Sequence, residues 1–227
     1  MPQYCYLGID DGYFDIRSKK AKKRCRTVLV ATVTCPHTLV AACIRPITVD
    51  ALDALQRAIE LIEELTSLVT IRAIFLDGVT FAGFNIIDPF KLYNIVEKPV
   101  ITVFRYPLDL DKVLTALKNN FGDWRIRYAT ISKTYGIACK VLPDHNILIA
   151  PVGVSMRRAM ELYNDARSYH PLPEALRLAD CLASGLTKYL ASQARSSWRA
   201  KADPLLRQCL DDEYTPFPRL DEESGQG

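Results

Sequence analysis

The chain has 227 residues, of which 49% are hydrophobic and 24% charged, a composition typical of a globular protein. The length suffices for one domain with a full core. No apolar run approaches the ~20 residues of a membrane-spanning helix, and no secretion signal opens the chain. We therefore expect a cytoplasmic protein with no membrane partner.

Charge is distributed unevenly along the chain. Residues 211–227 contain six acids and one arginine, a net charge of −5 within a total of +3, so residues 1–210 carry +8. An acidic end with two prolines and two glycines is predicted to be disordered. We expect a single domain over residues 1–200 and an acidic tail over residues 201–227.

The seven cysteines are odd in number and form no C-x-x-C pair. This pattern argues against a zinc ribbon and against a disulfide framework. Several cysteines, Cys5 and Cys181 among them, lie between apolar neighbours. They are predicted to be buried thiols.

The first part of the chain is predicted to form three strands and a helix. Residues 4–10, 27–34 and 38–44 are rich in β-branched and small apolar residues, which is typical of strands. Over residues 49–68 the apolar positions recur every three or four residues, which predicts an amphipathic helix. Another apolar strand is expected at residues 71–76.

The remainder alternates between the two kinds of element. Asp88 followed by Pro89 predicts the start of a helix. The expected strands are 100–104, 125–131, 137–142 and 147–151, the last two as a hairpin, and the expected helices are 88–97, 108–120, 155–167 and 173–199. This order predicts an α/β fold with a mixed sheet and helices on both faces. In such sheets functional sites lie beyond the carboxyl ends of the strands.

Two predicted strands end on acidic residues. Asp10 and Asp11 end the first strand, and Asp77 ends the fourth. Because successive strand residues point to opposite faces, only one of the first two can face a site beside Asp77. Taken alone, either Asp-Gly pair is explained better by a turn.

A third acid, Asp180, lies at the edge of the apolar stripe of the last predicted helix. A carboxylate there needs a partner, and Arg177 one turn earlier is one candidate. Alternatively, three acids converging from two strands and a helix would bind Mg²⁺ or Mn²⁺. Such a site predicts metal-assisted hydrolysis of a phosphodiester.

A basic segment joins the first two predicted strands. It is predicted to contact a nucleic-acid backbone, and the alternative is a solvated charged loop. Its seven basic residues are Arg17, Lys19, Lys20, Lys22, Lys23, Arg24 and Arg26.

Five stretches follow one another in the order of a known family: GIDDGYF (8–14), PITVDALDA (46–54), FLDGVTFAGFNIID (75–88), PVITVFR (99–105) and LPEALRLADCLAS (172–184). They resemble the archaeal endonuclease-dU-like family, which is similar to endonuclease V. The resemblance implies an RNase H-like fold and a metal-dependent endonuclease that acts at deaminated bases in DNA or RNA. It also implies a role in DNA repair.

The resemblance also implies roles for individual residues. Asp10 and Asp77 match catalytic, metal-binding acids, and Asp180 stands where family members have a histidine. The loop after Asp77 resembles a pocket for a base flipped out of its stack, with Gly78, Thr80, Gly83 and Asn85 as the candidates. Auxiliary residues would be Asp11, Asp53 and Gln56, the last of which replaces the family's glutamate.

Gln56 keeps two other functions open. An amide oxygen brings no negative charge, and its substitution for a carboxylate weakens Mg²⁺ binding. The alternatives to an active enzyme are a catalytically weakened nucleic-acid-binding protein and a protein-interaction scaffold on the same fold. The sequence predicts neither the base recognised, nor the kind and strandedness of the nucleic acid, nor the oligomeric state.

Overall fold

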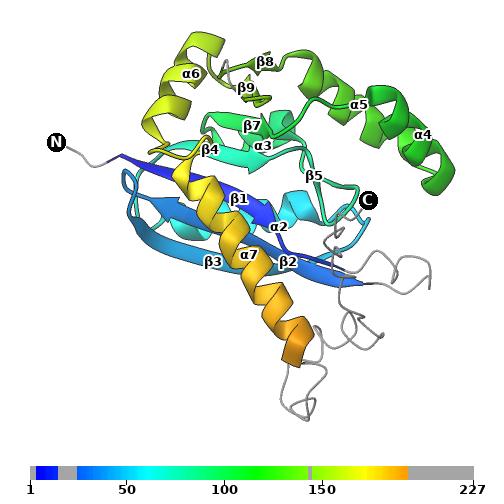
Figure 1. The fold of residues 1–227 in the computed structure, drawn as a ribbon, viewed down its shortest axis with the longest axis horizontal. Coiled ribbons are helices and arrows are strands. Elements are labelled where there is room, and N and C mark those ends of the chain that lie inside the picture. Colours follow the sequence, from blue (N-terminus) through cyan, green and yellow to red (C-terminus); the bar gives the residue numbers. More distant parts are fainter. Residues whose placement is uncertain (1–3, 15–24, 143–144, 194–227) are drawn as a thin grey trace, which may run out of the picture.

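The fold is described from a computed structural model, which defines residues 4–14, 25–142 and 145–193 (Figure 1). The acidic tail lies outside the described residues, and so does the basic segment, except for Arg26. None of the helices in the described ranges is long and apolar enough to cross a membrane.

A seven-stranded mixed sheet forms the centre of the fold, in the order β3-β2-β1-β4-β7-β9-β8. Strands β1, β4 and β7 are parallel to one another, and the other strands are antiparallel to their neighbours. A short separate hairpin, β5 and β6, follows β4. The strand bounds are β1 (Cys5–Asp11), β2 (Arg26–Thr34), β3 (Leu39–Thr48), β4 (Ile71–Asp77), β5 (Thr80–Phe81), β6 (Asn85–Ile86), β7 (Val100–Phe104), β8 (Cys139–Lys140) and β9 (Leu148–Val152).

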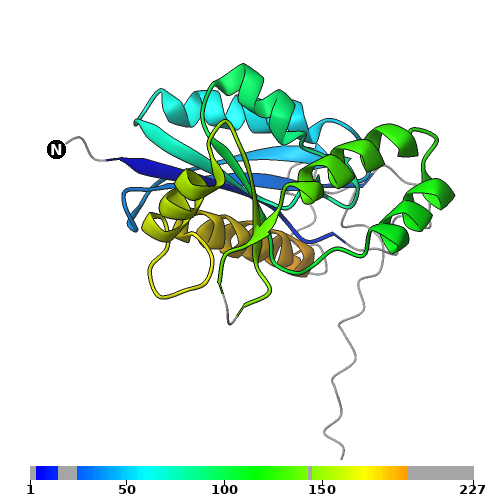
Figure 2. The same cartoon turned by 90° about the horizontal axis from the view of Figure 1, so that it is seen from above.

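Helices cover both faces of this sheet (Figure 2). Helices α2 (Ala54–Thr66) and α3 (Pro89–Val96) bury their apolar residues against one face. Helices α6 (Met156–Asp165) and α7 (Glu174–Gln193) cover the other face. Helices α4 (Leu110–Asn120) and α5 (Trp124–Gly136) form a separate lobe that packs on the β5–β6 hairpin. The mixed α/β architecture predicted from the sequence is confirmed.

Strand β1 lies close to helix α7, because Gly8 within the strand and Gly12 directly after it leave room for the helix. A Cβ atom added at Gly8 would lie 2.3 Å from the backbone nitrogen of Leu176. One added at Gly12 would lie 2.4 Å from the Cγ2 atom of Thr187. The side chain of Asp10, halfway between the glycines, therefore faces the same helix at short range.

Several local predictions are confirmed. Asp88 caps α3, and its side chain accepts a hydrogen bond from the backbone nitrogen of Phe90 at 2.9 Å. Ser155 likewise caps α6. The hairpin of β8 and β9 is present, with Lys140 opposite Leu148.

One element prediction is wrong, because residues 125–131 lie in helix α5 and not in a strand. The buried residues of this helix are Arg127, Ile131 and Thr134, which recur with helical spacing. Arg127 is only 5% exposed. A charged residue on the buried face interrupts the apolar pattern that would otherwise indicate a helix.

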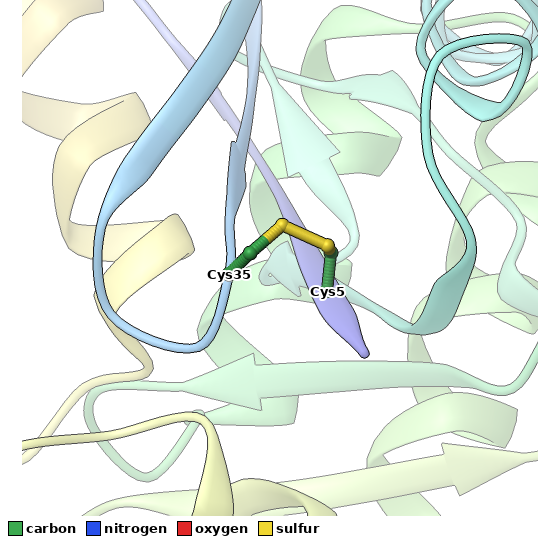
Figure 3. Close-up of a disulfide and its surroundings, with 2 residues drawn as sticks. All are labelled: Cys5 and Cys35. Atoms are coloured by element: carbon green, nitrogen blue, oxygen red, sulfur yellow. A yellow bond between two sulfur atoms is a disulfide. The ribbon is translucent and has the colours of Figure 1, made fainter. Parts of the chain in front are cut away.

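The prediction for the cysteines is also corrected. Cys5, at the start of β1, forms a disulfide with Cys35, directly after β2 (Figure 3). The two strands pair antiparallel, which brings the Cα atoms of these cysteines to 4.3 Å. Cys181 is exposed, whereas Cys25 is buried as predicted. Spacing along the chain gave no sign of the disulfide, because strand pairing and not sequence proximity creates it.

Candidate active site

Polar side chains lie together at the carboxyl ends of three parallel strands. Asp10 lies near the end of β1, Asp77 ends β4, and Arg105 directly follows β7. In the pairing of β1 with β4, Ile9 lies opposite Leu76, so the next residue of each strand, Asp10 and Asp77, are neighbours.

The alternation of side chains determines which way these residues point. Phe75 and Val103 belong to the apolar cluster on the side of α6 and α7. Asp77 and Arg105 each follow two residues later, so they point to the same side. Asp180 reaches this side from α7, one turn after Leu176, which packs in the same cluster.

The guanidinium of Arg105 lies among all three acids. Its Nε donates to Oδ1 of Asp77 at 3.0 Å, and its Nη1 donates to Oδ2 of Asp180 at 2.9 Å. Its Nη2 lies 3.2 Å from Oδ2 of Asp10 and 2.5 Å from Oδ2 of Asp77. The three acids predicted from separate parts of the sequence therefore meet around one cation.

The alternative partner considered for Asp180 is occupied elsewhere. The Nε of Arg177 donates to Oε1 of Glu174 at 3.2 Å, one turn earlier on the same helix. The hydroxyl of Ser184 donates to Oδ1 of Asp180 at 3.2 Å. Asp180 is thus held by Arg105 and Ser184, and the proposed ion pair with Arg177 is wrong.

Burial and mutual repulsion dominate the electrostatics of this cluster. Asp10 is 6% exposed, and burial, followed by Asp77 and Asp11, raises its pKa well above the usual range although Arg105 opposes the shift. Burial lowers the pKa of Arg105, but the carboxylates of Asp77, Asp180 and Asp10 outweigh this effect and raise it. When all three acids are ionised, the one guanidinium leaves the cluster with excess negative charge.

Asp11 lies next to the cluster but points to the opposite face of β1. Burial raises its pKa to about 7, while a hydrogen bond from the backbone of Ala82 opposes the shift. Its backbone nitrogen donates to Oδ1 of Asp10 at 2.8 Å. Asp11 therefore fixes the Asp10 carboxylate through its backbone and adds negative charge to the region.

The donor chemistry of the cluster fits a hard divalent cation, because carboxylate oxygens are the preferred ligands of Mg²⁺. The excess negative charge fits as well. The distances between the carboxylate oxygens, however, suit the guanidinium that they now surround. Within the part of the chain that the structure describes, no three His, Cys, Asp or Glu side chains are arranged to hold a metal ion. Asp10, Asp77 and Asp180 are the residues that would hold one.

The candidate base-pocket residues differ in burial: Asn85 is enclosed by the protein, whereas Gly78, Thr80 and Gly83 belong to the loop and short strand after β4. Gly78 and Gly83 have positive φ angles of 78° and 86°, a conformation that favours glycine, and Thr80 is half-buried in β5. Asn85 is fully buried. Its Nδ2 donates to the carbonyl oxygen of Thr48 at 2.8 Å, so its side chain is engaged within the protein.

Asn85 also contributes to fixing the start of α2. Its Oδ1 accepts from the backbone nitrogen of Ala54 at 3.0 Å, and its Nδ2 donates to Oδ1 of Asp53 at 2.5 Å. Asp53 in turn accepts from the backbone nitrogen of Thr48 at 3.2 Å. Gln56 is exposed, and its amide donates to Glu60 of the same helix at 3.4 Å.

A pocket of about 370 Å³ adjoins the acidic cluster, and its lining includes Arg105, Tyr106, His145 and His170. The Nδ1 of His170 accepts from the backbone nitrogen of Leu172 at 3.1 Å, which leaves the proton of the neutral ring on Nε2. Neither Arg105 nor this pocket was predicted from the sequence. Side chains alternate between the two faces of a strand, and Arg105 lies two residues after the buried Val103. This alternation was the signal in the sequence that Arg105 points to the same face as Val103.

Solved structures share the fold of this chain. The crystal structure of a protein of unknown function from Archaeoglobus fulgidus matches with a TM-score of 0.68 and 25% identity, covering 81% of this chain and 98% of that chain. Endonuclease V from Ciona intestinalis, in complex with a 24mer DNA containing an inosine followed by a ribo-adenosine, matches with a TM-score of 0.56 and 14% identity, covering 82% and 87%. The chain therefore has the RNase H-like fold of endonuclease V, as predicted.

Sequence comparison defines the family within this fold class. The chain belongs to the endonuclease dU family, whose sequence profile matches residues 2–187. The UPF0215 protein of Methanothermobacter thermautotrophicus is 34% identical over 182 residues, which is 80% of this chain and 86% of that relative. The family resemblance of the five sequence stretches is confirmed.

Proposed function

We propose that this protein is a metal-dependent endonuclease that hydrolyses phosphodiester bonds at deaminated bases in DNA or RNA. The observation that carries the proposal is the meeting of Asp10, Asp77 and Asp180 at the carboxyl ends of the parallel strands. Membership of the endonuclease dU family and the endonuclease V fold support a nuclease. The inosine-containing DNA bound to the Ciona enzyme supports a deaminated base as the feature recognised.

The three acids would hold Mg²⁺ or Mn²⁺, which when bound supplies an activated water and stabilises the leaving oxygen of the phosphodiester. Asp10 is the least exposed of the three side chains, at 9%, and Asp180 is the most exposed, at 33%. Asp10 therefore anchors the site, and Asp180 faces the approaching nucleic acid. The backbone nitrogen of Asp11 holds one oxygen of Asp10, which leaves Oδ2 to the cluster.

The loop that follows Asp77 would receive the base. Gly78 and Gly83 have no side chains to obstruct a close approach to the backbone, and Thr80 offers a hydroxyl. Asn85 contributes indirectly, because it ties the hairpin to the start of α2. The basic segment before β2, whose charge suits a phosphate backbone, would hold the rest of the strand.

Nicking of uracil- or inosine-containing oligonucleotides, single- and double-stranded, with Mg²⁺ or Mn²⁺ tests the proposal. Asp77→Asn keeps the shape of the side chain but removes its charge, and we expect a loss on the order of 100-fold or more. Asp111→Asn, on the exposed side of α4, is the matched control and should act like wild type. Failure of the wild type to nick any of these strands would refute the proposal.

A second candidate is a nucleic-acid-binding protein with weakened catalysis. The observation that favours it is Gln56, which is uncharged and hydrogen-bonded to Glu60 on its own helix. Filter binding over a range of salt concentrations would then show affinity that falls steeply with salt and that Asp77→Asn leaves unchanged. Absence of affinity even at low salt would leave the protein-interaction scaffold, which pull-downs with and without residues 211–227 would test.

A further inference from the structure

Arg105 occupies the point on which the three candidate metal ligands converge. Its nitrogens lie 2.5 to 3.2 Å from oxygens of Asp10, Asp77 and Asp180. A guanidinium presents several N–H donors in one plane, and here a single one serves three carboxylates from three separate elements. The acids are thus already held together by a cation that belongs to the chain.

A divalent ion and this guanidinium cannot share that point. Mg²⁺ requires carboxylate oxygens at about 2.0 to 2.1 Å in octahedral geometry, whereas the oxygens now surround a planar group at hydrogen-bond distances. A metal that draws Asp10 and Asp77 together would displace the nitrogens between them. Binding of the metal and the present position of Arg105 are therefore mutually exclusive.

The pocket beside Arg105 offers its side chain a second position. The residue lies on the boundary between the acidic cluster and the pocket of about 370 Å³, which it also lines. Its side chain is 31% exposed, and it follows the end of β7 instead of lying within the sheet. Rotation of the side chain about its own bonds would carry the guanidinium from the acids toward the pocket, and such a rotation leaves the strand in place.

We propose that Arg105 is a resident competitor of the metal, so that a divalent ion binds the three acids only as the guanidinium leaves them for the pocket. The inference rests on the proposed function for the presence of a metal, but it does not depend on nuclease activity. It assigns Arg105 a positioning role: in the metal-free protein it keeps mutually repelling acids in place, and it lowers the affinity of the site for metal.

Direct measurement of Mn²⁺ binding, by calorimetry and electron paramagnetic resonance, tests this inference without a nuclease assay. Arg105→Gln removes the competing charge, and we expect Mn²⁺ to bind at least about 10-fold more tightly than to wild type. The control is Arg72→Gln at the opposite end of β4. Arg72 also pairs with a carboxylate, Asp165, and its side-chain exposure of 30% matches that of Arg105.

Two further measurements keep the inference testable if Arg105→Gln folds poorly. Arg105→Lys keeps a positive charge but lacks the planar, forked donors of the guanidinium, so its Mn²⁺ affinity should lie between those of wild type and Arg105→Gln. In Arg105→Ala, added guanidinium ion should lower the Mn²⁺ affinity, as a free competitor would. Equal affinities in all variants, or weaker binding in Arg105→Gln, would overturn the inference.

The outcomes also separate this inference from the proposed function. If neither wild type nor any variant binds Mn²⁺, both the metal-dependent function and the inference fail. If wild type binds Mn²⁺ as tightly as Arg105→Gln, only the inference fails.

Discussion

Replacing Gly8 by alanine would test whether the close approach of α7 to β1 is necessary. The new Cβ would lie 2.3 Å from the nitrogen of Leu176 and 2.4 Å from the carbonyl carbon of Ala175. Both are backbone atoms, which cannot rotate away, and ordinary contact begins at 3.4 Å. The helix would therefore have to move outward by roughly 1 Å, and overpacking of this kind costs about 1–3 kcal/mol.

We expect the free energy of unfolding of Gly8→Ala to fall by about 3 kcal/mol, the upper end of that range, because the contact is with backbone. Urea denaturation followed by circular dichroism measures it. Gly185→Ala is the control: it lies on the exposed side of α7, where an added Cβ meets nothing within 4 Å. Alanine should stabilise this helix by about 1 kcal/mol.

A second readout ties the same substitution to the site. Asp180 lies on α7 one turn after Leu176, so an outward shift of the helix separates it from Arg105 and Asp10. Nuclease activity and Mn²⁺ affinity should then fall in Gly8→Ala and remain unchanged in Gly185→Ala. If Gly8→Ala is as stable as wild type within about 0.5 kcal/mol, the packing argument is refuted.

Three other substitutions probe features outside the acidic cluster. Cys5→Ser opens a disulfide that spans 30 residues, so urea denaturation without reductant should show a loss of about 3–4 kcal/mol, and reductant should remove the difference from wild type. Burial, followed by Arg177, lowers the pKa of His170 below its ordinary 6.5, so its contribution to stability is complete above pH 6.5 and lost as pH falls further. Stability curves of His170→Asn should be flatter than wild type below pH 6.5, and a curve as steep as that of wild type would contradict this role of His170. Asn85→Ala leaves buried partners unpaired and should lower the unfolding free energy by about 3 kcal/mol, a value that a result near zero would contradict.

The sheet and most helices were predictable because their apolar periods are intact. Helix α5 was not predictable, because a buried arginine, Arg127, interrupts its apolar pattern. The Nη1 of Arg127 donates to the carbonyl oxygen of Ala51 at 3.0 Å and also to that of Phe84, and the guanidinium lies 4.4 Å from the centre of the Phe121 ring. A polar anchor replaces the apolar residue that would have marked the buried face. The partners that make such burial possible lie 43 and 76 residues away, so local sequence carries no trace of them.

The candidate site was predictable in its acids but not in its cation. Asp180 stood out because a carboxylate at the edge of an apolar helix stripe needs a partner. Asp10 and Asp77 stood out only in combination, because a single Asp-Gly pair at a strand end is explained by a turn. Arg105 follows a strand in the same way, but an arginine at a strand end is common at a protein surface. Alternation along β7 gives the face of the sheet to which Arg105 points, and the parallel register of β4 with β7 places it beside Asp77.

Strand β3, which forms one edge of the sheet, differs along its length. In its first part Leu39, Val40 and Ile44 are exposed by 42 to 49%, whereas Arg45 and Pro46 follow in its second part. A charged residue and a proline discourage the addition of another strand, so only residues 39–44 present an apolar template for edge-to-edge association. Aggregation that follows partial unfolding near this edge would therefore begin at residues 39–44. Replacing Val40 by lysine should suppress it, because a charged side chain on an edge strand discourages the addition of another strand.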